Sequence, residues 1–150
     1  MNKKDLKSKI NDLLVVHEDD GSYFLFGKYK IVPDNLGNFD LIDVLDGKTF
    51  IHRFFTLKNA VTYCVFDKNN KYKELKRIVE LDSLLGGIDV LILQHQRLAD
   101  KSEDRDSKSI FLAKLIESKL KKRAMTKEIN SYISVSKHWQ SQKFKENQAR

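Results

Sequence analysis

The sequence contains little cysteine, proline or glycine and no long apolar run, and each shortage excludes a class of protein. Cys64 is the only cysteine, which excludes an internal disulfide framework and a cysteine-based zinc cluster and fits a reducing compartment. One proline and six glycines in 150 residues predict long regular elements with few irregular loops. The run Leu13-Leu14-Val15-Val16 is too short for a signal peptide, and no stretch approaches the roughly 18 apolar residues of a membrane span. We therefore expect a cytoplasmic protein with no membrane partner.

Charge is abundant but unevenly distributed along the chain. There are 28 Lys and Arg against 21 Asp and Glu, a net charge of +7. The segment 108–150 carries 11 basic and 3 acidic residues, a net of +8, so the other 107 residues are nearly neutral at −1. A localised positive field attracts polyanions. The charge therefore predicts a neutral body with a basic C-terminal arm, whose partner is a nucleic acid, either DNA or RNA.

The apolar pattern predicts a single α+β domain over residues 1–150. Four parts follow one another along the chain: an N-terminal helix (1–20), an antiparallel meander of three or four strands with a helix packed across it (21–70), an antiparallel helical hairpin (71–140) and a frayed basic tail (141–150). Within the first part, the amphipathic spacing places the helix over residues 3–16.

Short apolar segments separated by turn residues predict the strands of the meander, namely Ser22–Phe26, Lys28–Val32, Phe39–Leu45 and Lys48–Phe55. Asp46-Gly47, between the last two, is a strong hairpin signal because a type I′ turn needs positive φ at both central positions. In the last strand, alternation places Phe50, His52 and Phe54 on one face. Thr56 is the expected N-cap of a helix over 57–68, in which Cys64 is expected to be an inert core thiol.

The second half has helical periodicity. Leu84, Ile88, Leu91, His95 and Leu98 recur at the spacing of a coiled coil. Gly86-Gly87 interrupts this pattern and indicates a kink, a break or a close helix approach. A polar turn over 101–109 leads into a last helix from about Ser109, which is expected to fold back on the first. The spacing fits an intramolecular hairpin and an intermolecular coiled coil equally well.

No pattern indicates catalysis or metal binding. His17, His52, His95 and His138 are far apart, and no pair has the spacing of ligands on a helix. Glu74-Leu75-Lys76 has the Glu-x-Lys form of Mg²⁺-dependent nucleases, but in a helical pattern its Glu and Lys diverge by about 200°. The sequence contains neither a glycine-rich phosphate cradle nor a nucleophile elbow. We therefore expect no enzyme, no cofactor and no metal.

Basic and aromatic residues of the last helix are the candidates for nucleic-acid binding. A first group can neutralise phosphates and comprises Lys114, Lys119, Lys121, Lys122, Arg123 and Lys127. A second group mixes lysines with aromatic rings, as single-strand binders do, and comprises Lys137, Trp139, Lys143 and Phe144. The alternatives are a solvated helix face for the first group and a packing role for Trp139.

Two resemblances extend this interpretation. The segment 27–68, with His52-Arg53-Phe54-Phe55-Thr56-Leu57-Lys58-Asn59-Ala60-Val61-Thr62-Tyr63 leading from strand to helix, resembles the DNA-binding modules of the AP2 and phage-integrase arm type. That resemblance implies DNA contacts from the sheet, where the comparable cations are Lys28, Lys30, Lys48 and Arg53. The whole chain also resembles uncharacterised small proteins of T4-like marine bacteriophages, through Leu57–Cys64 and Ser136–Ser141. The second resemblance implies a bacteriophage setting.

These observations predict a non-enzymatic, phage-type accessory protein that binds nucleic acid without sequence specificity through its basic C-terminal helix. The alternative is a virion structural or assembly component that acts through its helical hairpin. In that case Leu84, Ile88, Leu91 and Leu98 would contact a second copy or another protein. The expected location is the cytoplasm, which for a phage protein is that of the host, or the virion.

Overall fold

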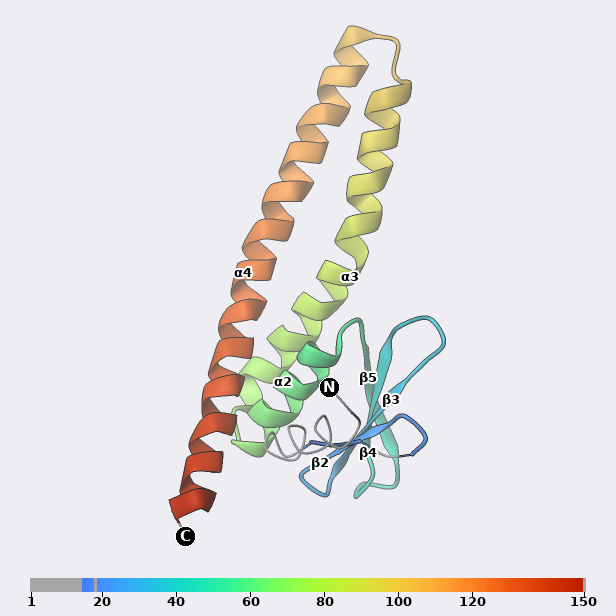
Figure 1. The fold of residues 1–150 in the computed structure, drawn as a ribbon. Coiled ribbons are helices and arrows are strands. Elements are labelled where there is room, and N and C mark those ends of the chain that lie inside the picture. The colour runs from blue at the N-terminus through green and yellow to red at the C-terminus, as the bar shows by residue number, and fades with distance from the viewer. Residues whose placement is uncertain (1–14, 18, 150) are drawn as a thin grey trace.

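A five-stranded antiparallel sheet and three helices make up the part of the chain that the structure, a computed structural model, describes, namely residues 15–17 and 19–149 (Figure 1). The strands follow in sequence order across the sheet. The elements are β1 (Val15–His17), β2 (Tyr23–Leu25), β3 (Tyr29–Pro33), β4 (Phe39–Asp43), β5 (Thr49–Phe54), α2 (Leu57–Lys68), α3 (Tyr72–Lys101) and α4 (Arg105–Ala149). The predicted α+β class is confirmed: an antiparallel meander, helices packed against it and a C-terminal pair of long helices.

The first strand corrects the predicted N-terminal helix. Residues 1–14 lie outside the described residues, but Val15–His17 form β1 and pair with β2, with Val16 opposite Phe24. The predicted helix over 3–16 is therefore wrong at its C-terminal end, and the sheet has one strand more than the meander of three or four. Two consecutive β-branched residues favour a strand once an aromatic strand is available to pair with them.

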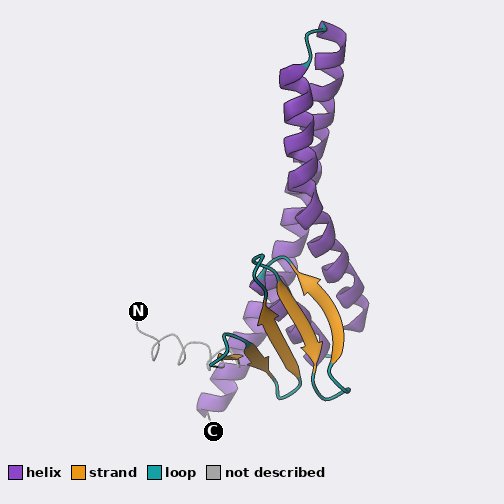
Figure 2. Cartoon of the chain, turned by 90° about the vertical axis from the view of Figure 1, so that its right-hand side faces the viewer, coloured by secondary structure: helices purple, strands orange, loops and turns teal. Residues whose placement is uncertain are grey.

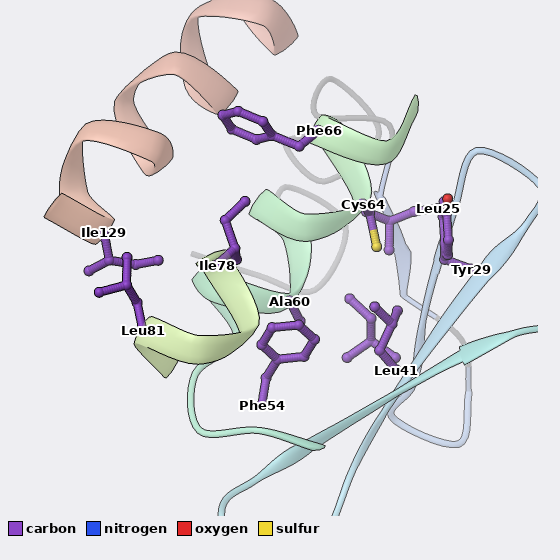
Figure 3. Packing of buried hydrophobic residues seen from close by; sticks show 11 residues of the cluster. Leu25, Tyr29, Leu41, Phe54, Ala60, Cys64, Phe66, Ile78, Leu81 and Ile129 are labelled. Carbon is purple, nitrogen blue, oxygen red and sulfur yellow. The ribbon is translucent and has the colours of Figure 1, made fainter. Parts of the chain in front are cut away.

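The sheet buries one face against α2. Leu25, Tyr29, Ile31, Leu41 and Phe54 are buried. Figure 3 shows Leu25, Tyr29, Leu41 and Phe54 on the side of the sheet that faces α2. The β4–β5 ladder contains a bulge, because Leu41 is opposite His52 whereas Ile42 is opposite Phe50. The bulge moves Phe50 to the open face, where it is 56% exposed. The expectation that Phe50 shares a face with His52 and Phe54 is therefore wrong.

Helix α2 lies between the sheet and the two long helices. It begins where predicted, with the Thr56 side chain accepting a hydrogen bond from the Asn59 N–H at 3.1 Å. Ala60 and Cys64 are fully buried, and burial raises the pKa of the Cys64 thiol well above its usual range. Both observations agree with an inert core thiol.

Helices α3 and α4 form an antiparallel hairpin that projects beyond the sheet (Figures 1 and 2). Helix α3 passes through Gly86-Gly87 without interruption. A break is therefore excluded, and the close neighbour of Gly86 is not a helix but the Phe55 ring, since an added Cβ would lie 2.1 Å from Phe55 Cε2. Gly87, in contrast, has nothing within 4 Å of that position.

The ends of α4 differ from the prediction. The connecting turn is short, and Asp104 accepts hydrogen bonds from the Ser107 N–H at 3.1 Å and its hydroxyl at 3.0 Å. These bonds lower the pKa of Asp104 and cap a helix that begins at Arg105, before the predicted start at Ser109. At the other end, α4 continues as helix to Ala149, through the stretch 141–149 that was expected to fray.

Arg77 and Glu128 connect the two long helices near the body of the protein. Arg77 Nε donates to Glu128 Oε2 at 2.6 Å and Nη2 donates to Oε1 at 2.8 Å, a bidentate pair that lowers the pKa of the Glu128 carboxyl. Nearby, Phe66 of α2 packs against Tyr132 and Trp139 of α4, with ring centroids 5.5 and 4.9 Å apart. These contacts fix the orientation of the hairpin on the body.

Candidate nucleic-acid interface

An open groove between α3 and α4 brings together four of the predicted phosphate-binding residues. Its volume is about 590 Å³, and its lining comprises Asp89, Ile92, Lys119, Lys122, Arg123, Thr126, Lys127 and Asn130. Lys119, Arg123 and Lys127 are spaced four residues apart and Lys122 precedes Arg123, so the four cations share a flank of α4. We call these four residues the groove cations.

The groove has a net positive charge, because four cations and one acid, Asp89, line it. Lys122 Nζ lies 2.6 Å from Asp89 Oδ1, and their side chains are 44% and 65% exposed. Within the described residues, Lys119, Arg123 and Lys127 take part in no ion pair. The groove therefore has a net charge of about +3, carried by side chains that solvent and a ligand can reach.

A second groove continues from the first toward the body. Its volume is about 420 Å³, and it shares Asp89, Lys122, Thr126 and Asn130 with the first. At its far end lie Thr56, Lys58 and Asn59, in the first turn of α2. The exposed Lys58 adds a cation there, so the positive surface extends from α4 toward the N-terminal end of α2.

Asp82, which the sequence reasoning missed, forms the floor of the second groove. It is fully buried on α3 and accepts hydrogen bonds from the Phe55 N–H at 3.1 Å and the Asn59 side-chain amide at 2.9 Å. The His52 Nε2 lies 3.1 Å from its other carboxylate oxygen. His52 belongs to β5, Phe55 to the turn that follows it and Asn59 to α2, so Asp82 joins the sheet, α2 and the hairpin. The sequence contained one sign of this role, because Asp82 is an acid next to apolar residues of a predicted helix.

The other predicted lysines lie away from the groove. Lys121 pairs with Glu117 at 3.3 Å, and Lys114 Nζ lies 5.9 Å from the centre of the Phe111 ring. Lys137 is exposed on α4, outside the residues that line either groove. Of the eight predicted site residues whose side chains the structure describes, the four groove cations are the ones that it brings together.

The two aromatic candidates lie near the C-terminal end of α4. Trp139 is partly buried and packs against Phe66 and the hydrophobic core, which favours the packing role over base stacking. Phe144 and its neighbour Lys143 lie in α4, in the stretch whose side chains the structure does not describe.

The cations of the sheet are mostly engaged with acids. Lys28 Nζ lies 3.5 Å from Asp67 and 3.7 Å from Asp43, and Arg53 Nε donates to Asp40 at 2.8 Å. Lys30 pairs with Asp20 at 3.6 Å. Such pairing weakens the case for DNA contacts of the AP2 or integrase-arm kind from this sheet.

The Glu-x-Lys triplet does not have the geometry of a nuclease metal site. Glu74 and Lys76 lie on α3, where they cannot point at a shared metal from adjacent strand positions. Within residues 15–17 and 19–149, no group of three or more His, Cys, Asp or Glu could hold a metal ion. No helix in the same part of the chain is both long and apolar enough to cross a bilayer.

The chain matches no known protein family, no curated protein and no solved structure.

Proposed function

We propose that this protein binds nucleic acid without sequence specificity, through phosphate contacts made by the groove cations. The observation that carries the proposal is their convergence: four basic side chains of one helix flank line an open groove that contains a single exposed acid. Lys and Arg bind phosphate by neutralising it and releasing counterions. Half of the residues that line the groove are cations, and phosphate contacts carry no sequence information, which favours binding independent of sequence.

The role we propose is that of a non-enzymatic accessory protein, of the phage type that the sequence resembles. Satisfied hydrogen bonds around Asp82 favour a structural role for that carboxylate over a catalytic one. Backbone contacts alone do not discriminate among single-stranded and double-stranded DNA and RNA. All of them should therefore be compared as ligands.

A double variant with a matched control tests the proposal. Lys119→Gln/Arg123→Gln removes two groove cations and should weaken binding roughly tenfold at about 50 mM salt. Lys73→Gln/Lys76→Gln removes two exposed lysines from α3, away from both grooves, and should leave the Kd nearly unchanged. Equal losses in both variants, measured by fluorescence anisotropy, would show that total charge rather than the groove determines binding.

A second candidate function is assembly through the hairpin, as a structural or virion component. It is favoured by three leucines of α3, Leu84, Leu91 and Leu98, which remain exposed although they have coiled-coil spacing. Ile88, predicted to belong to the same contact surface, is instead buried inside the hairpin. A constant oligomer that ignores added DNA and RNA would favour assembly over nucleic-acid binding.

A further inference from the structure

Three exposed leucines form a stripe along one flank of α3. Leu84, Leu91 and Leu98 are 46%, 45% and 37% exposed and recur every seven residues. Ile88, Ala99 and Leu115 of the hairpin are buried, whereas the three leucines of the stripe remain partly exposed. Large apolar side chains gathered on one surface are typical of a protein interface.

The leucine stripe and the basic groove lie on opposite flanks of the hairpin. Successive residues of a helix are about 100° apart, so Leu91 lies about 160° around α3 from Asp89, which lines the groove. On α4, Lys121 lies about 100° around the helix from Lys122, and Glu117 lies one turn before Lys121. Because Asp89 and Lys122 meet on the groove side, Glu117 and Lys121 share the other flank with the leucines.

We propose that the leucine stripe binds a second copy of this chain, in an antiparallel dimer whose two-fold axis passes close to Leu91. This arrangement places Leu91 against its symmetry mate and Leu84 against Leu98 of the second copy. Seven-residue spacing keeps all three leucines at the seam of two antiparallel helices. The proposal does not depend on nucleic-acid binding, since both grooves remain on the outer faces of the dimer.

Charge complementarity supports a second copy over an unrelated partner. The contacts Asp89–Lys122 and His95–Ser118 set the register of the hairpin, and they place Leu91 level with about position 120 of α4. Along α4, Glu117 lies just before that level and Lys121 just after it. Within one copy Lys121 pairs with Glu117 at 3.3 Å, and the same two-fold axis places this pair beside its symmetry mate, with Glu117 of each copy opposite Lys121 of the other. A surface that is its own electrostatic complement under a two-fold axis fits an isologous dimer.

Sedimentation of the full chain over a concentration series tests the proposal. The wild type should dimerise reversibly, and Leu91→Glu should weaken the dimer roughly 100-fold or more, because two like charges would meet at the axis. Val90→Glu is the matched control: Val90 is 68% exposed and lies off the stripe, so this variant should dimerise like the wild type. A wild type that stays monomeric throughout, or equal behaviour of the two variants, would overturn the proposal.

Charge exchange tests the orientation of the two copies. Lys121→Glu places two acids opposite Glu117 and its symmetry mate, and should weaken dimerisation roughly tenfold. The double variant Glu117→Lys/Lys121→Glu re-creates both contacts with the charges exchanged, so it should recover most of that loss. If the double variant dimerises no better than Lys121→Glu, the antiparallel arrangement is wrong.

Discussion

Replacing Asp89 with asparagine should strengthen nucleic-acid binding, although the change removes an ion pair. The Asp89 carboxylate lies 2.6 Å from Lys122 Nζ and faces any phosphate that enters the groove. Two unit charges about 7 Å apart in water interact by roughly 0.6 kcal/mol, close to threefold in affinity, and the lower effective permittivity near a protein increases this. We expect Kd to fall roughly 3- to 10-fold. Because Lys122 becomes free to contact phosphate, the log–log salt slope should steepen by about 0.7–0.9.

Fluorescence anisotropy with labelled DNA and RNA, repeated over several salt concentrations, measures both quantities. The control is Glu103→Gln, which removes one exposed acid at the tip of the hairpin, outside the groove lining. A gain of affinity is a sharper test than a loss, since a misfolded variant cannot produce it. If Asp89→Asn binds like the wild type, or if Glu103→Gln gains as much affinity, the Asp89 carboxylate does not oppose phosphate in the groove.

Three further predictions concern stability, each measured by chemical denaturation. Gly87→Ala should stabilise the protein by about 0.5–1 kcal/mol through helix propensity, whereas Gly86→Ala should destabilise it, because the new methyl group displaces a packed aromatic ring. Asp82→Ala should cost about 2–4 kcal/mol, since it leaves buried donors unpaired; a loss below 0.5 kcal/mol, roughly that of an ordinary surface change, would contradict this. Glu128 has a lowered pKa because of Arg77, so Glu128→Gln should be less stable than the wild type at pH 7, and the difference should vanish as the pH falls through that lowered pKa. A difference that persists in acid would contradict the last prediction.

Local signals in the sequence predicted the elements that local chemistry determines. Thr56 caps α2 because a hydroxyl beside the first turn suffices to accept the Asn59 N–H. The helical periodicity of the second half predicted the antiparallel hairpin that α3 and α4 form. The basic composition of α4 likewise located the candidate surface on one helix.

Features that depend on distant partners could not be predicted. β1 exists because Val15 and Val16 pair with β2, and a short apolar run alone fits a helix equally well. The bulge that moves Phe50 off the packed face depends on the register with β4. Which lysines of α4 line the groove and which lie on the opposite flank depends on the register of α4 against α3. The contact between Asp89 and Lys122 reveals that register.

Whether the groove cations contact phosphate can be answered by measuring how affinity depends on salt in the wild type and in Lys119→Gln/Arg123→Gln/Lys127→Gln. With Lys122 paired to Asp89, three phosphate contacts predict a log–log slope of about −2.1 for single strands or −2.7 for duplex DNA. Removal of three groove cations should reduce the magnitude of that slope by about 2 or more. An equal slope in wild type and variant, or no binding at about 50 mM salt, would contradict the assignment of function to the groove.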